Sequence, residues 1–135
     1  MDGPVPKRWA PQLQSALRIA AAFLFIAHGT QKLFAFPTTA PRNPVALVSL
    51  LGLAGVLEAF GGSLLLLGLF TRPVAFLLAG EMAAAYFTSH APRSFWPLLN
   101  SGEPAVLFCF IWLFVAAAGP GPWSLDARRA PGKRT

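Results

Sequence analysis

The chain has 135 residues, of which 55% are hydrophobic and only 12% charged, and its net charge is +6. A soluble domain carries about 25% charged residues, so the composition excludes a disordered chain and favours a membrane protein. The single cysteine excludes a disulfide framework, a dithiol redox motif and a two-cysteine zinc site made by this chain alone.

Prolines divide the chain into its predicted elements. Thirteen prolines bound four proline-free stretches, and a helix tolerates proline only in its first turn. The stretches are too long for strands and lack a two-residue alternation, whereas a spanning helix needs about 20 residues. The sequence therefore predicts an all-α integral membrane four-helix bundle, with spans at about 17–36, 45–70, 74–91 and 104–119.

Basic, proline-rich tails are expected on both sides of this transmembrane domain. The predicted boundaries are 1–11, 12–119 and 120–135. One side of the predicted bundle carries seven flanking cations, and the other carries Arg42 and Arg93. The seven are Lys7, Arg8, Arg72, Arg128, Arg129, Lys133 and Arg134. Because cytoplasmic flanks are enriched in lysine and arginine, both termini are predicted to be cytoplasmic.

The tails also limit the partners. Each tail has one tryptophan and no series of aromatic residues interleaved with its basic residues, so nucleic acid is not predicted as a partner, whereas membrane lipids are. Trp9, Trp96 and Trp123 fall outside the apolar stretches, where an aromatic belt at the membrane surface is expected.

Ionisable and polar residues inside the apolar stretches are the candidate functional residues, because such residues are costly in a membrane. The predicted polar pocket consists of Arg18, His28, Lys32, Glu58, Glu81 and Tyr86. A rise of about 1.5 Å per residue divides the polar residues into two layers. The inner layer holds Arg18, Glu58 and Glu81; the outer holds His28, Lys32, Tyr86, His90, Arg93 and Glu103.

Helical phase indicates which of these polar residues lie on the same helix face or point into the bundle. His28 and Lys32 are four residues apart and share a face. Glu58 lies on a side of its stretch that carries several glycines, so it is expected to point into the bundle. His28 with Glu58 is the first pair to test, and His90 is treated as a boundary residue. Two interpretations stay open: a salt bridge that fixes helix register, or a pocket for a headgroup, a quinone oxygen or a proton.

Several of these stretches resemble the DoxX family of small four-helix membrane proteins of bacteria and archaea. The resemblance covers about residues 12–127. It rests on these segments: Arg18-Ile19 through His28-Gly29-Thr30-Gln31-Lys32-Leu33-Phe34; Gly55-Val56-Leu57-Glu58-Ala59-Phe60-Gly61-Gly62; Leu67-Gly68-Leu69-Phe70-Thr71-Arg72; Gly80-Glu81-Met82-Ala83-Ala84-Ala85-Tyr86; and Gly119-Pro120-Gly121-Pro122-Trp123-Ser124-Leu125-Asp126.

The resemblance implies a multi-pass protein of the bacterial cytoplasmic membrane that works near membrane redox chemistry. The family takes its name from a subunit of a thiosulfate:quinone oxidoreductase, and other members are linked to thiol-redox partners. The implied role is a subunit of a membrane redox system with a pocket for a quinone or lipid-like molecule, beside a soluble or membrane redox partner protein. A homodimer is left open.

The residues limit that role. The chain has no cysteine pair, no Rossmann glycine fingerprint and no haem-attachment motif. No self-contained catalytic motif is present, so enzymatic activity stays open. No metal or covalent cofactor is predicted, and quinone is the cofactor that stays open. Two alternatives remain: a non-enzymatic membrane scaffold or assembly partner, and a small proton-coupled transporter.

Overall fold

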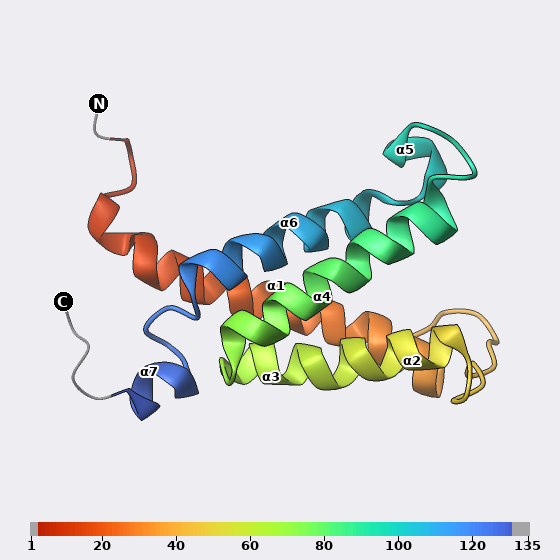
Figure 1. Cartoon of the computed structure of the whole chain (residues 1–135), viewed down its shortest axis with the longest axis horizontal. Coiled ribbons are helices and arrows are strands. Elements are labelled where there is room, and N and C mark those ends of the chain that lie inside the picture. The colour runs from red at the N-terminus through yellow and green to blue at the C-terminus, as the bar shows by residue number, and fades with distance from the viewer. Residues whose placement is uncertain (1–2, 131–135) are drawn as a thin grey trace.

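The computed structural model describes residues 3–130, and the chain is helical without strands in that range (Figure 1). This confirms the all-α prediction. The elements in chain order are η1 (Lys7–Trp9), α1 (Ala10–Phe34), α2 (Leu50–Val56), η2 (Leu57–Gly61), α3 (Gly62–Leu67), α4 (Thr71–Ala85), η3 (Tyr86–His90), α5 (Pro97–Asn100), α6 (Glu103–Ala118) and α7 (Leu125–Arg129).

Two of the long helical rods are composite. The π-helical turn η2 joins α2 to α3, so that residues 50–67 form one rod, and the π-helical turn η3 extends α4 to residue 90. Together with α1 and α6 they make four rods, close to the four predicted stretches.

Local chemistry sets the ends of the second rod. It begins at Leu50 because the Ser49 hydroxyl accepts a hydrogen bond from the backbone N–H of Gly52 at 3.0 Å, which is an N-cap. It ends before Gly68, whose φ of +68° is the left-handed conformation that glycine adopts easily at a helix end.

The rods form two pairs (Figure 1). In one pair α1 packs along α2, η2 and α3; in the other α4 packs along α6. The pairs cross near their middle and diverge at the end where α2 and α5 lie. The start of α1 and the short α7 lie together at the opposite end.

Aromatic side chains join the two pairs where they cross. Phe25 of α1 packs edge-on against Phe108 and Trp112 of α6, with ring centroids 5.1 and 5.5 Å apart. All three are buried, and Leu65 and Leu78 complete the same core. Such edge-to-face contacts add about 0.5–1.5 kcal/mol each beyond apolar burial.

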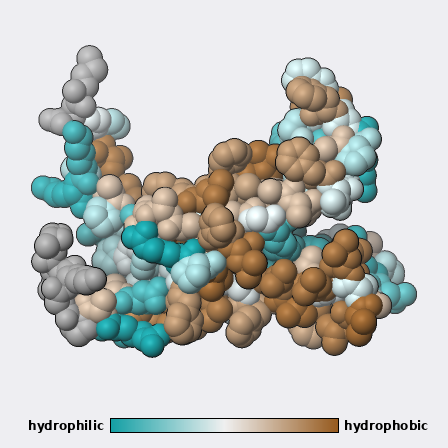
Figure 2. All heavy atoms as spheres, in the orientation of Figure 1, coloured by the Kyte–Doolittle hydropathy of each residue, from teal (hydrophilic) through white to brown (hydrophobic). Residues whose placement is uncertain are grey.

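The outer surface is strongly apolar. Phe23, Phe60, Phe76 and Phe110 each expose about two thirds of their area, and Figure 2 shows apolar residues over much of the visible face. Exposed apolar area on this scale marks a membrane or protein interface. Within the described residues, two helices are long and apolar enough to cross a membrane, Lys7–Phe34 and Leu50–Leu67, and Glu103–Ala118 is a shorter apolar helix.

Arg18 closes one end of the structure. Its buried guanidinium donates to the carbonyls of Leu65 and Leu66 at the end of α3, at 2.5 and 2.9 Å. It also donates to the carbonyls of Pro120 and Trp123, at 2.8 and 2.5 Å. The last carbonyls of a helix lack intrahelical partners, so the Arg18 guanidinium supplies the hydrogen bonds that they need. Its positive charge also interacts favourably with the negative end of the helix dipole.

The segment after α6, which the sequence analysis treats as a basic tail, is therefore attached to the helices through residue 126. Gly121 has a φ of +77°, and a Cβ on it would lie 2.2 Å from the Ser15 hydroxyl. Only glycine suits both conditions. Lys133 and Arg134, which the predicted orientation counts as cytoplasmic cations, lie outside the described residues.

Asp126 caps α4 from outside that helix. Its carboxylate accepts hydrogen bonds from the backbone N–H groups of Phe70 at 3.0 Å and Thr71 at 2.9 Å. Partial burial opposes ionisation of Asp126. The bonds from Thr71 and Phe70 and the positive charge of Arg129 outweigh burial and lower the pKa of this carboxyl below its ordinary value.

The Asp126→Asn variant tests this cap. Because the pKa is lower in the folded chain, the contact contributes stability that is fully present above the ordinary aspartate pKa of about 4 and is lost as pH falls through the folded pKa. Near neutral pH the variant should lose part of the about 0.5–2 kcal/mol that removal of an N-cap costs, because the amide keeps one acceptor oxygen but loses the second acceptor and the charge, and the difference from wild type should shrink in acid. Denaturation in detergent across pH measures it; Glu103→Gln, which removes an exposed carboxylate, is the control. A difference that stays constant with pH contradicts the assignment.

Candidate functional site: a polar cleft between the helix pairs

The site begins with a close contact between α1 and the second rod. A Cβ on Gly29 would lie 2.4 Å from the backbone nitrogen of Ala59 and 2.8 Å from the carbonyl oxygen of Gly55. The backbones can therefore approach this closely only because residue 29 is glycine. The contact brings Lys32, one turn further along α1, to the level of Glu58.

Lys32 and Glu58 form the one salt bridge in residues 3–130. The Lys32 ammonium lies 2.6 Å from a carboxylate oxygen of Glu58, and the side chain of Lys32 is 26% exposed against 4% for Glu58. Glu58 sits in the π-helical turn η2. Such turns are rare and frequently occur at functional sites. Because Glu58 is buried, its charge depends on Lys32 for compensation.

Glu81 adds a second carboxyl group to this pair. It projects from α4, and the charged groups that act on it are Glu58 and Lys32. Both of its carboxyl oxygens are buried and have no hydrogen-bond partner among the described residues. The structure thus gathers one cation and two carboxyl groups from three different rods.

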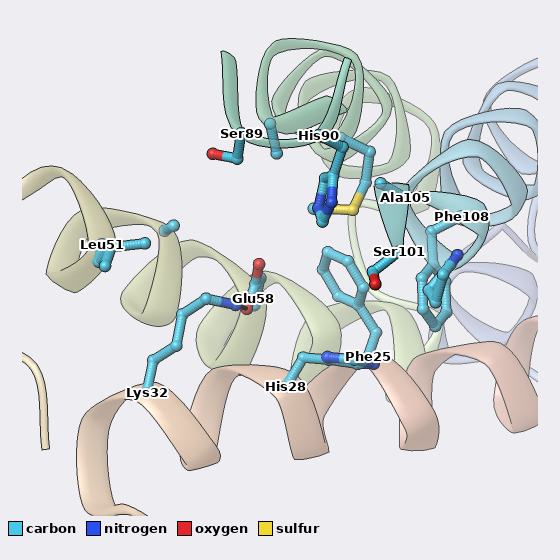
Figure 3. Close-up of a pocket in the computed structure, with 14 residues that line it drawn as sticks. Phe25, His28, Lys32, Leu51, Glu58, Ser89, His90, Ser101, Ala105 and Phe108 are labelled. Atoms are coloured by element: carbon cyan, nitrogen blue, oxygen red, sulfur yellow. Dashed lines mark hydrogen bonds and ion pairs between the residues drawn. The ribbon is translucent and has the colours of Figure 1, made fainter. Parts of the chain in front are cut away.

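Glu58 and Lys32 face a cleft of about 290 Å³ that opens where the two helix pairs diverge (Figures 2 and 3). Figure 3 shows Lys32, His28 and Glu58 on one wall and Ser89 and His90 on the facing wall. Further lining residues are Phe25, Leu51, Ala54, Met82, Ala85, Ser101, Pro104, Ala105 and Phe108. The cleft therefore combines two polar walls with an aromatic and apolar floor.

His90 is held in place on the far wall. Its Nδ1 lies 3.0 Å from the carbonyl oxygen of Asn100. A carbonyl can only accept, so Nδ1 carries the hydrogen, and in the neutral ring Nε2 is then an acceptor. The buried Asn100 side chain donates to the Tyr86 hydroxyl at 3.3 Å and to the Ser94 carbonyl at 2.9 Å. This network fixes the connection between η3 and α6, and with it the position of His90.

The six residues predicted to form one polar pocket lie at three different places in the structure. His28, Lys32 and Glu58 line the cleft, and Glu81 adjoins it through Glu58. The exposed His28 ring packs edge-on against Phe108, with centroids 5.8 Å apart. Tyr86 stacks on His90 behind the far wall and lines a separate apolar cavity of about 260 Å³.

Arg18 lies elsewhere. It bonds to backbone carbonyls at the closed end rather than to Glu58 or Glu81, so the structure does not assemble the inner layer of three that depth alone suggests. The position of a residue along a predicted helix gives its depth in the membrane and the helix face on which it lies. It does not reveal whether the partner of the side chain is a carboxylate or a helix-terminal carbonyl.

Ser89, Ser101 and Phe108 line the cleft although they are not among the residues predicted from the sequence, and His90 was predicted only as a boundary residue. The spacing of Tyr86 and His90, four residues apart on one face, is the signal that could have placed His90 at the site. Within residues 3–130 no group of three or more histidine, cysteine, aspartate or glutamate side chains is arranged to hold a metal ion.

These features define a helical membrane protein with a polar cleft between two helix pairs, and comparison with known proteins gives its family. The DoxX family profile matches residues 13–91, which reach from α1 to just past η3. The chain belongs to the DoxX family.

Two relatives extend the similarity to most of the chain. An uncharacterised protein of Haemophilus influenzae is 40% identical over 129 residues, covering 89% of this chain and 92% of the relative. An uncharacterised membrane protein of Mycobacterium tuberculosis is 27% identical over 128 residues, covering 83% of this chain and 78% of the relative. No solved structure matches the chain.

A pair of glycine variants tests the close contact that sets up the site. Gly29→Ala places a methyl group against the backbone of Ala59 and should cost about 1–3 kcal/mol, as overpacking does. Gly80→Ala is the matched control, because a Cβ there meets nothing within 4 Å and alanine favours a helix by up to about 1 kcal/mol. Thermal unfolding in one detergent compares them. Equal stabilities for the two variants would refute the close-approach role of Gly29.

Proposed function

We propose that this protein binds an amphipathic molecule of the quinone or lipid type in the cleft, as a membrane subunit of a redox system. The observation that carries the proposal is the arrangement of the cleft: a charged pair on one wall, a histidine and serines on the other, and aromatic rings between them. Ligand sites are typically apolar clefts with a few fixed polar groups.

The lining fits such a molecule chemically. The Lys32 ammonium has three N–H donors, of which Glu58 uses one, so a ligand carbonyl can accept from another. The neutral His90 ring offers Nε2 as an acceptor for a ligand hydroxyl. A flat ring with oxygens on opposite sides can meet both walls and rest on Phe25 and Phe108.

Size and surroundings support the same class. Binding pockets for small molecules span about 300–1,000 Å³, and a cleft of about 290 Å³ accommodates a head group or single ring rather than a long tail. The tail would extend between the apolar rims, where Leu51 is exposed, and into the lipid. A quinone bound there would supply electron-carrying capacity, while this chain's residues bind and orient its oxygens.

The membrane arrangement is part of the proposal. We propose four spans, formed by α1, the rod of residues 50–67, the rod of residues 71–90 and α6, in the bacterial cytoplasmic membrane. Supporting it, the start of α1 and α7 lie at one end (Figure 1), as an even number of crossings requires. Lys7, Arg8, Arg72, Arg128 and Arg129 belong to that end's segments, and this excess of cations supports a cytoplasmic location for that end.

Ligand binding is measured as stabilisation. For a ligand at 100 times its Kd, the free energy of unfolding rises by about 2.7 kcal/mol. We expect decylubiquinone, or monoolein if the site takes lipid, to raise the Tm of the purified protein. The neutral double variant Lys32→Met/Glu58→Gln should abolish that rise without leaving an unpaired charge, whereas Glu103→Gln should keep it. A wild-type Tm that neither compound changes overturns the proposed ligand class.

Cysteine labelling tests the spans and their orientation. In a Cys109→Ala background, Arg93→Cys should react with a membrane-impermeant maleimide on intact cells, because the connection before α5 is placed outside. Arg128→Cys should react only after permeabilisation, because α7 is placed in the cytoplasm. The reverse pattern would invert the topology, and equal labelling of both sites on intact cells would exclude it.

A further inference from the structure

Glu81 is a buried acid that the proposed ligand contacts leave unused. Both of its carboxyl oxygens are inaccessible and unbonded among the described residues, and it does not line the cleft. An ionised carboxylate without a donor is among the most costly groups to bury. Something must therefore compensate Glu81.

The charges around Glu81 do not supply that compensation. Lys32 is the one cation acting on it, and Lys32 already lies 2.6 Å from Glu58. Two carboxylates against one ammonium would leave a net negative charge inside an apolar structure, and like-charged carboxyls at one site cannot both ionise readily.

The remaining titratable groups near the cluster are His28, on the same wall of the cleft as Lys32 and Glu58, and His90 on the facing wall. His28 on α1 is exposed and packs on Phe108 of α6, and His90 at the end of η3 bonds through Nδ1 to the Asn100 carbonyl. Neither forms a hydrogen bond to Glu81 in the described part of the chain. The group that balances the cluster is therefore a proton.

We propose that Lys32, Glu58 and Glu81 form a proton-binding site, with one proton held by Glu81 and available to Glu58. In this state the three side chains carry +1, −1 and 0, so the cluster is neutral. Transfer of the proton from the Glu81 carboxyl to the Glu58 carboxylate leaves the total charge unchanged. Because Glu58 lines the cleft, the cleft is the place where this proton exchanges with a ligand or with water.

Proton binding at this site is a function additional to the proposed ligand binding, and it does not require a ligand in the cleft. A proton stored beside a ligand cleft makes proton-coupled binding or transfer available to any bound molecule that takes up or releases hydrogen. Glu58 then has two roles: it forms the salt bridge with Lys32, and it passes the proton between Glu81 and the cleft.

Infrared spectroscopy of purified protein at neutral pH, in an ester-free detergent, tests the proposal by counting protonated carboxyl groups. Wild type should show a C=O band of a protonated carboxyl that shifts in heavy water. The Glu81→Gln variant should lose it, and the exposed-site control Glu103→Gln should keep it. Absence of the band in folded wild type, or its persistence in folded Glu81→Gln, overturns the proposal.

Two further variants keep the test decisive if Glu81→Gln does not fold. In Glu58→Gln, Glu81 must ionise to balance Lys32, so the band should disappear. In Lys32→Met, both acids lose their cation, so the band should reach about twice its wild-type intensity. An unchanged band in both variants contradicts charge balance as the cause. The measurement needs no ligand, so its outcome and that of the decylubiquinone experiment are independent.

Discussion

The contact between Lys32 and Glu58 is the constraint on which the site depends. A charged side chain surrounded by apolar atoms must be compensated, and Glu58, with 4% of its side chain exposed, has one cation within reach. That requirement sets the register of α1 against the second rod. Register in turn requires close backbone approach, which Gly29 permits, and a local change of helical pitch, which η2 supplies at Glu58. The salt bridge, Gly29 and η2 depend on one another, because a shift of any of them by one residue would turn Lys32 or Glu58 to a different helix face.

Buried polar groups have different kinds of partner at the two ends of the molecule. At the closed end, the Arg18 guanidinium is bonded to carbonyls of α3 and of the segment after α6. Every one of these partners is backbone, so this end is built for rigidity. At the open end, Lys32 keeps donors that no side chain in residues 3–130 uses, and the Glu81 carboxyl has no hydrogen-bond partner in that range. The donors of Lys32 and the carboxyl group of Glu81 that the described residues leave without partners are the physical reason to place function in the cleft.

Much of this was accessible from the sequence, and the rest was not for identifiable reasons. Proline spacing and long apolar stretches predicted the all-helical fold, because proline acts locally and span length is fixed by geometry. The choice of Glu58 as inward-facing followed from the glycines on its side. The pairing of Lys32, rather than His28, with Glu58 depends on the pitch of η2 and on a contact between residues 26 positions apart, which periodicity does not encode. Asp126 was missed because a cap supplied from another segment leaves no pattern near the helix it caps.

His90 shows how a residue's role can depend on its support rather than on its own position. As a residue at a predicted span end it invites no functional interpretation. Asn100 changes that, because its carbonyl fixes the ring through Nδ1 and its side chain fixes the connecting segment through Ser94 and Tyr86. The far wall of the cleft is therefore preorganised although it lies next to a loop. With a donor-rich wall on α1 and an acceptor held opposite it, the cleft favours a ligand that accepts on one side and donates on the other. The proton proposed for Glu81 would lie one transfer step, through Glu58, from such a ligand.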